Sequence, residues 1–539
     1  MACASTGTFP IRVDDGLVLR ADVFRPVAAG KHPVILTYGP YGKWLHFEDL
    51  YTDQWRRMVE QHPDVPAGST NKYQNWEVVD PEKWVPDGYA CVRVDSRGAG
   101  RSPGRLDIWS AREAKDLYHC IEWAAEQAWS NGKVGLNGIS YYAMNQWQVA
   151  ALEPPHLAAI CIWEGAADYY RDLSHHGGIL CTFGRAWFPS QVIRVQHGRG
   201  TRGYRSRMNG DWVSGPSTLT EEELGGTRRD FYEDCWANPL ASDDYWRSRM
   251  PDWSKVKVPL FSSANWGGQG LHPRGNFEGF VRSAAKQKWL EVHGIEHWTH
   301  FYTDYGVSLQ KKFFGHFLKG EDTGWKKQPK VVLQVRHPGE TFVERHENEW
   351  PLARTRWTKL YLSPADQGLV RAPVARRGAV TYDGLGRRRH VSHAAAAARD
   401  RDHRPHRREA LRLVADDRRR SVLDRPRAHP EHEGSRLPGR AGPAHPDRAG
   451  MAPRLTPKAR SEAHAPVPAL PHARREAAAD RRQDLRARRR DLADVDRGAG
   501  RLPPRAHGAR ARLRIPGRAV DRARHARRGV HRRRPVPAQ

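Results

Sequence analysis

The sequence has few of the residues that mark several protein classes. Its 539 residues include six cysteines, with no CxxC pair and no metal-ligand spacing, which excludes a disulfide scaffold and a cysteine-based metal site. No stretch approaches about 18 uncharged apolar residues, and residues 1–9 have neither a basic start nor an apolar run. We therefore predict a cytoplasmic protein with reduced, mostly buried thiols, no membrane span and no signal peptide.

Aromatic side chains are absent from the last part of the chain. Every Trp, Tyr and Phe precedes residue 387. Residues 387–539 hold 41 Arg and 1 Lys against 17 Asp and Glu, a net +25 that leaves +3 for residues 1–386. A segment with this charge and no large aromatic side chain cannot offset its ordering entropy, so we predict that it is disordered. Residues 1–386 are enough for a large domain with an insertion or a partner domain.

The arginine-rich segment has two interpretations. Its arginines would attract phosphate, which makes a nucleic-acid-binding protein the alternative function for the whole chain. However, it lacks aromatics for base stacking, has almost no Lys and contains no nucleic-acid-binding motif. Its composition changes abruptly at residues 384–389 to the Arg, Ala, Pro, Gly and His mixture that GC-rich codons give out of frame. We therefore interpret residues 387–539 as a frameshifted translation, with at most nonspecific nucleic-acid binding.

The first half of the chain alternates strands with helices. Apolar runs rich in β-branched and aromatic residues, of lengths that suit strands buried on both faces, occupy residues 33–38, 89–95, 133–138, 158–163, 258–264 and 288–294. Residues 111–127 place apolar side chains at helical spacing between two of these runs. This order predicts an α/β fold whose parallel sheet is covered on both faces.

The pattern also predicts how the domains are divided. Residues 174–252 are rich in Trp, Tyr and Arg with glycine-rich turns, which is typical of a lid inserted between two strands. Further strand-like runs at residues 330–335, 341–343 and 357–362 indicate a β-rich domain that begins near residue 328 and is never completed. We thus assign residues 10–173 and 253–327 to the core, 174–252 to a helical cap and 328–386 to the truncated β domain.

The most informative stretch is residues 134–147, VGLNGISYYAMNQW. A strand ends in Gly138-Ile139-Ser140, and the residues that follow can continue as a helix. A nucleophile elbow has this strand–turn–helix context, because the tight turn exposes a serine Oγ while the next backbone N–H points at the developing oxyanion. Tyr142 stands where the glycine-flanked pattern has its last glycine. Ser140 is therefore the candidate nucleophile.

Motifs spread over residues 10–385 carry a resemblance to a known family. They are residues 13–16 (VDDG), 19–26 (LRADVFRP), 40–43 (PYGK), 95–104 (DSRGAGRSPG), 129–135 (WSNGKVG) and 138–141 (GISY). On these residues the chain resembles the CocE/NonD hydrolases, which are related to cocaine esterase and the X-prolyl dipeptidyl-peptidases. The resemblance implies an α/β-hydrolase fold with a helical cap and a C-terminal jelly-roll domain. By position, it implies Ser140 as nucleophile and an oxyanion hole formed by the Tyr141 N–H and the Tyr41 hydroxyl.

The acid of a catalytic triad is less clear. Family members commonly place an Asp after a Trp on the penultimate core strand, but residues 265–270 (NWGGQG) contain no carboxylate. Glu164 directly follows the strand run 158–163, so its carboxylate can face the same sheet edge as Ser140. We favour Glu164, with Glu278 and Glu296 as alternatives. If Glu164 has only a structural role, we expect it to form a salt bridge with an arginine such as Arg171.

The base is expected in residues 294–300, GIEHWTH, which follow the last core strand. We favour His297, with His300 second and His272 a third possibility near the same rim. The predicted function is a serine hydrolase, of acyl esterase or X-Pro dipeptidyl-peptidase type, that cleaves a small-molecule ester or amide through an acyl-enzyme. This chemistry needs no metal and no other cofactor. The sequence does not fix the oligomeric state.

Overall fold

The computed structural model describes residues 8–375 except Gln269, Glu340 and Asp366, together with the backbone of Cys3–Ser5 and Ser392–His393. The predictions of a disordered tail, a frameshift and nucleic-acid binding concern residues 387–539, which lie outside the described residues apart from that short backbone segment. Within the part that is described, no helix combines the length and the apolar character that a membrane crossing requires.

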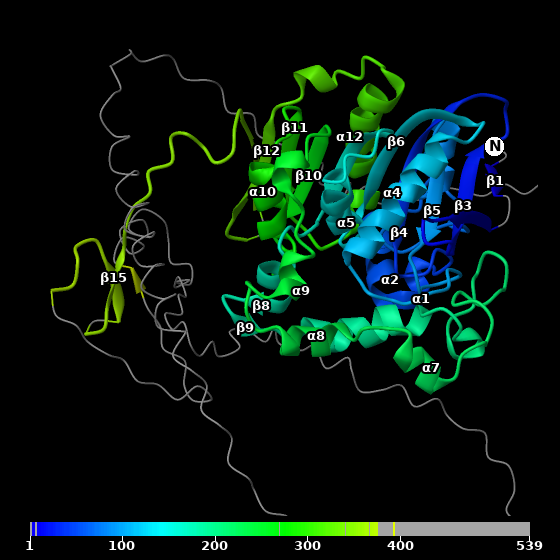
Figure 1. The fold of residues 1–539 in the computed structure, drawn as a ribbon. Helices are drawn as coiled ribbons and strands as arrows, with labels where there is room; N and C mark the ends of the chain where they lie inside the picture. Colours follow the sequence, from blue (N-terminus) through cyan, green and yellow to red (C-terminus); the bar gives the residue numbers. More distant parts are fainter. Residues whose placement is uncertain are drawn as a thin grey trace, which may run out of the picture. The chain divides into compact units, whose positions relative to one another are not determined.

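One mixed sheet of eleven strands forms the centre of the described chain (Figure 1). Its strands follow the order β1, β3, β5, β4, β6, β7, β10, β11, β12 and β13, with β2 paired to β3. Their bounds are β1 (Cys3–Ser5), β2 (Phe9–Arg12), β3 (Val18–Pro26), β4 (His32–Gly39), β5 (Ala90–Asp95), β6 (Ser130–Ile139), β7 (Leu157–Trp163), β10 (Leu260–Asn265), β11 (Lys288–His293), β12 (Val331–His337) and β13 (Thr341–Glu347). From β5 to β12 the neighbours run parallel, whereas β1, β2, β3 and β13 pair antiparallel. The six strands predicted from apolar runs are confirmed as β4, β5, β6, β7, β10 and β11.

The central strands are apolar on both faces, because each face packs against its own core. In β7, Ala159, Cys161 and Trp163 belong to one hydrophobic cluster, and Ile160 and Ile162 belong to the other. Alternate residues of a strand point to opposite faces of its sheet, so a doubly covered strand reads as a continuous apolar run. This is why the sequence pattern located these strands.

Helices cover both faces of the sheet. On one face α4 (Ala111–Ala125) and α5 (Tyr141–Ala150) pack against β4 and β6, and α10 (Pro273–Arg282) packs against β10 (Figure 1). On the other face, α12 (Asp304–Phe314) brings Phe313 and Phe314 into the cluster that holds Cys161. Ser110 caps α4 by accepting the N–H of Glu113, and residues 111–127 therefore begin their helix where the sequence predicts.

Short helices fill the segment between β7 and β10. They include two π-helices (Tyr169–Ser174 and Phe188–Val192), α6 (Phe183–Trp187), α7 (Glu221–Gly226), α8 (Phe231–Ala237) and α9 (Asp244–Arg247), with a small hairpin of β8 (His175–His176) and β9 (Ile179–Leu180). The segment docks on the loop before α4, where the rings of Trp109 and Trp187 stack with centroids 5.4 Å apart. Phe231 packs edge-on against both rings. All of these elements lie in the predicted cap, residues 174–252, except the π-helix Tyr169–Ser174, which begins before it.

Residues after 328 extend the main sheet before they leave it. β12 pairs in parallel with β11, aligning Val331 with Leu290, and β13 returns antiparallel to β12. The first three residues of β12, Val331 to Leu333, are apolar and buried at the edge that β11 would otherwise leave open. The first two strands of the predicted β domain therefore belong to the sheet of the core. A separate hairpin follows, formed by β14 (Tyr361–Ser363) and β15 (Gly368–Val370).

Candidate active site

Ser140 stands at a strained turn between β6 and α5. Its backbone has φ 55° and ψ −111°, a conformation that is costly for a residue with a side chain and that typifies a nucleophile elbow. Its N–H donates to the carbonyl of Trp163 on β7 at 3.1 Å, and its carbonyl accepts from Met144 at 2.8 Å in the first turn of α5. The turn is thus fixed from both sides, with the serine side chain at the carboxyl edge of the sheet.

The tyrosine that departs from the glycine-flanked pattern is accommodated by two other glycines. A Cβ on Gly138 would lie 2.4 Å from the Cβ of Tyr142, and a Cβ on Gly39 would lie 2.8 Å from its ring. Tyr142 is buried in the space that these glycines leave. The elbow therefore keeps its backbone although its second flanking residue is large.

His272 is the imidazole in contact with Ser140. It precedes α10, and its Nε2 lies 3.1 Å from the Ser140 Oγ. Its Nδ1 lies 3.3 Å from the carbonyl oxygen of Gly268, so a proton on Nδ1 leaves the Nε2 lone pair for the serine hydroxyl. Burial, and then the positive charge of His297, lower the pKa of His272 to about 3. This imidazole is neutral at pH 7.

Glu164 and His297 form a buried pair beside His272. Glu164 directly follows β7, and its Oε2 binds the Nδ1 of His297 in the loop after β11. Burial alone raises the pKa of Glu164, but the charge and hydrogen bonds of His297 and His293 outweigh it and hold the pKa below its usual range. The rings of His297 and His272 are stacked, with centroids 4.7 Å apart and an interplanar angle of 5°. Arg171 pairs instead with Asp168, at 2.6 Å.

A second histidine supports Glu164 from the other side. The Nε2 of His293 lies 3.2 Å from Glu164 Oε1, and its Nδ1 lies 2.8 Å from Glu291 Oε2. Burial lowers the pKa of His293, but Glu291 and Glu164 outweigh it and raise the pKa to about 9. The imidazolium therefore holds a positive charge between two buried carboxylates.

The residues predicted to form the oxyanion hole lie among aromatic side chains. Tyr141 is the first residue of α5, so its backbone N–H has no partner within the helix. The Tyr41 ring packs edge-on against the ring of Tyr141, with centroids 5.7 Å apart. The Tyr41 hydroxyl accepts the indole N–H of Trp187 in the cap at 3.1 Å and keeps its own proton for donation. The Tyr141 N–H thus belongs to the elbow, and the Tyr41 ring packs against Tyr141 and Tyr142, the two residues after Ser140.

The other predicted candidates lie elsewhere. His300 is half-buried and packs edge-on against His293, and burial lowers its pKa to about 4. Glu278 binds Arg282 at 3.0 Å on α10. Glu296 is exposed and accepts from the Thr299 hydroxyl at 3.4 Å.

Comparison with known proteins assigns this chain to a family. Residues 15–302 match the family described as X-Pro dipeptidyl-peptidase (S15 family). The chain belongs to this family.

Two similar proteins show how much of this S15 member is shared with its relatives. Cocaine esterase from Rhodococcus sp. (strain MB1 Bresler) is 26% identical over 396 residues, which are 67% of this chain and 62% of the esterase. The crystal structure of a CocE/NonD family hydrolase from Staphylococcus aureus is 36% identical with a TM-score of 0.56, over 69% of this chain and 60% of that one. The predicted CocE/NonD resemblance and α/β-hydrolase fold are therefore confirmed. The chain spans only about three fifths of the length of either relative.

Sequence reasoning missed three buried residues in this S15 site. Glu291 and His293 are two residues apart in a buried strand, so both point to one face of the sheet. This spacing is visible in the sequence and could have indicated the pair. Glu77, a single acid within the run NWEVV, lies 3.5 Å from the Nε2 of His297. The conformation of its loop, which the sequence does not state, places it there.

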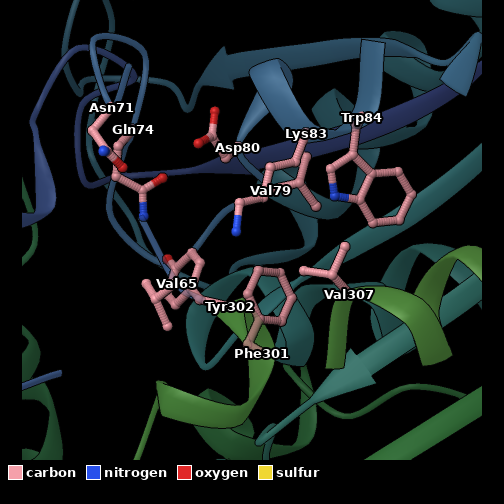
Figure 2. A pocket seen from close by; sticks show the side chains of 10 residues that line it. All are labelled: Val65, Asn71, Gln74, Val79, Asp80, Lys83, Trp84, Phe301, Tyr302 and Val307. Atoms are coloured by element: carbon pink, nitrogen blue, oxygen red, sulfur yellow. The ribbon is translucent and has the colours of Figure 1, made fainter. Parts of the chain in front are cut away.

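A pocket near the histidine loop is separate from this cluster. Figure 2 shows its ten lining residues, which are Val65, Asn71, Gln74, Val79, Asp80, Lys83, Trp84, Phe301, Tyr302 and Val307. Phe301 and Tyr302 belong to α11 (Thr299–Tyr302), directly after the loop that carries His297. Ser140, His272 and Glu164 do not line it, so this pocket is no part of the candidate site.

Proposed function

We propose that this S15 family member is a serine hydrolase that cleaves an ester or amide bond through an acyl-enzyme on Ser140. The observation that carries the proposal is the position of the Ser140 Oγ, which stands on an elbow with φ 55° and lies 3.1 Å from an imidazole nitrogen. A serine hydroxyl becomes a competent nucleophile when an adjacent base takes its proton.

In the proposed first step, the proton of Ser140 passes to the Nε2 of His272 as the Oγ attacks the substrate carbonyl. His272 is favoured because it makes the contact and presents a free lone pair. The His272 cation then gives this proton to the leaving group, and water releases the acyl group by the reverse route. Burial and the charge of His297 oppose the His272 cation, and the nearby charge of Glu164 partly offsets them.

His297, the base predicted from the sequence, is the alternative. It has a carboxylate on Nδ1, which is the arrangement of a serine–histidine–acid triad. Its Nε2, however, is 3.5 Å from Glu77. For His297 to act as the base, this nitrogen would have to turn from Glu77 to Ser140.

The oxyanion would receive the Tyr141 N–H and the Tyr41 hydroxyl, each contributing about 3 kcal/mol to the transition state. The aromatic rings of Trp109 and Trp187 next to these donors favour a hydrophobic acyl group. The names of the relatives suggest the two substrate classes to assay, p-nitrophenyl esters for the esterase and X-Pro anilides for the dipeptidyl-peptidase.

A fluorophosphonate probe tests the proposal, because it reacts with an activated serine. We expect covalent labelling of the wild-type chain and its loss in Ser140→Ala. Ser174→Ala is the matched control, since the Ser174 hydroxyl also contacts a histidine, at 2.9 Å from His175 Nδ1, but lies in a π-helix away from the elbow. Labelling that survives in Ser140→Ala and disappears in Ser174→Ala would refute the assignment.

A further inference from the structure

Glu77 is a buried carboxylate that the proposed reaction leaves without a role. Its backbone has φ 58°, an unusual conformation for a residue with a side chain. Its carbonyl oxygen accepts the N–H of Ile139, the residue before the nucleophile, at 3.0 Å. The Glu77 backbone is therefore attached to the strand that ends in the elbow.

The side chain of Glu77 points to the histidine loop. Its Oε1 accepts the indole N–H of Trp298 at 3.0 Å and lies 3.5 Å from the Nε2 of His297. Its Oε2 is buried and has no hydrogen-bond partner among the described residues. Burial raises the pKa of Glu77, and the hydrogen bond from His297 opposes this shift. A buried carboxylate without full solvation gains most from a cationic partner.

His297 consequently lies between two carboxylates from different parts of the chain. Glu164, after β7, binds its Nδ1, and Glu77, before α3 (Pro81–Trp84), faces its Nε2. The His272 ring stacks on one face, and the Trp298 ring lies 4.6 Å from the centroid of the His297 ring. An imidazole with an acceptor at each nitrogen is held most firmly as the imidazolium, which donates from both.

We propose that Glu77 is a positioning residue of this site, which fixes the His297 imidazole from its Nε2 side while Glu164 fixes it from the Nδ1 side. Glu77 acts through His297 and touches no reacting atom. The inference rests on the proposed function, in which Ser140 is the nucleophile of the site that His272 and His297 share. Its physical content is that the charge of Glu77 sets both the orientation and the proton affinity of His297.

The pH dependence of activity reports this charge. Burial alone lowers the pKa of His297, but the carboxylates of Glu164 and Glu77 outweigh it and raise the pKa to about 9. Removing the Glu77 charge leaves burial opposed by Glu164 alone. The pKa of His297 must then fall, so the limb of the kcat/KM profile that reports His297 moves to lower pH.

Glu77→Gln is the decisive variant, because the amide oxygen still accepts from Trp298 while the charge is gone. We expect this limb to move down by about one pH unit or more, with a smaller change in KM than in kcat. Glu77→Asp keeps the charge and should restore most of the wild-type limb position. Asp80→Asn is the matched control: it removes a buried carboxylate three residues on, whose pKa is also raised by burial, and should leave the limb in place.

A limb that stays in place in Glu77→Gln would overturn the proposal, as would an equal displacement in Asp80→Asn. For a variant too slow for turnover, the measurement is the proton NMR signal of the His297 Nε2–H, the group that faces Glu77. This downfield signal is assigned by its loss in His297→Gln. Loss of that signal in Glu77→Gln but not in Glu77→Asp supports the role, and an unchanged signal refutes it. Failure of the proposed function is a separate result, namely labelling or turnover that persists in Ser140→Ala.

Discussion

The two sides of the Ser140 site differ in how they treat a buried carboxyl group. On the imidazole side, Glu164 is completely buried, yet His297 and His293 hold its pKa below the usual range. On the aromatic side, Glu113 is also buried, and burial raises its pKa to about 7 although Tyr141 and the Trp109 N–H donate to it. Hydroxyl and amide donors leave the pKa of buried Glu113 raised, whereas two imidazolium partners lower the pKa of buried Glu164.

This difference matches the proposed role of each side of the site, which is proton transfer on the imidazole side and oxyanion binding on the aromatic side. A proton acceptor needs nearby charge to stabilise the imidazolium that forms, and the ends of β7, β10 and β11 bring the required groups together. An oxyanion needs neutral donors already in place, and the tyrosine and tryptophan cluster offers these in a dry environment. We therefore call the histidines and carboxylates around Glu164 the charged half of the site and the neutral donors around Tyr41 its uncharged half.

The largest expected effects come from the stacked histidines on the charged side. We expect His272→Ala to lower kcat/KM by about 10⁴-fold, because it removes the base in contact with Ser140, and His297→Ala by about 10²-fold. Steady-state kinetics on a p-nitrophenyl ester measure both. His300→Ala is the control and should change kcat/KM far less, because its half-buried ring contacts His293 and not the serine.

The reverse order of these two losses would make His297 the base, as the sequence predicts. Equal and small losses in both variants would contradict the division of the site into a charged and an uncharged half, since neither imidazole would then serve Ser140.

The sequence could predict the parts of the site that depend on strand order. The apolar runs locate the strands, and the motif around Ser140 locates the elbow, because both are set by local periodicity and turn chemistry. The approach of Glu164 to His297 follows from the shared carboxyl edge of parallel strands. These predictions need only the order of the strands and not the path of any loop.

The partner of Ser140 could not be predicted in the same way. His272 reaches the serine from a segment that turns after β10, where the Gly268 N–H binds the Asn265 carbonyl at 3.1 Å. Glu77 reaches His297 from a loop in which its own backbone has a positive φ. Such contacts depend on backbone conformations that side-chain patterns do not encode, and they decide which of several nearby histidines meets the nucleophile.

A second test compares the two buried glutamates through stability. The pKa of Glu113 rises on folding from 4.5 to about 7, so its contribution is favourable below pH 4.5 and is lost as the pH rises through 7. Glu113→Gln has no such loss. We therefore expect its stability relative to wild type to increase by about 3 kcal/mol between these limits, seen in urea unfolding midpoints at both ends of the range.

Glu164→Gln gives the opposite sign, because a lowered pKa stabilises the fold above the unfolded value and this contribution disappears as the pH falls. The free energy of unfolding of Glu164→Gln, relative to that of the wild type, should therefore decrease as the pH rises. The same sign in both variants would show that the two carboxyl groups do not differ in the way the structure indicates.

The smallest expected effect concerns the cap on the uncharged side. Trp187→Phe removes the indole N–H that binds the Tyr41 hydroxyl at 3.1 Å and keeps a ring to stack on Trp109. We expect kcat to fall by about fivefold to tenfold, the worth of one neutral hydrogen bond. Tyr41→Phe itself should lower kcat by about 10²-fold, because it removes an oxyanion donor.

The double variant decides whether Trp187 acts through Tyr41. In the Tyr41→Phe background, Trp187→Phe should have no further effect on kcat, since the hydroxyl it orients is already gone. Trp246→Phe is the control within the same cap: its indole N–H binds the Asn238 carbonyl at 2.7 Å, away from the oxyanion side, and its loss should be additive with Tyr41→Phe. If Trp187→Phe is also additive, the cap serves only to cover the site, and the hydroxyl of Tyr41 is oriented without it.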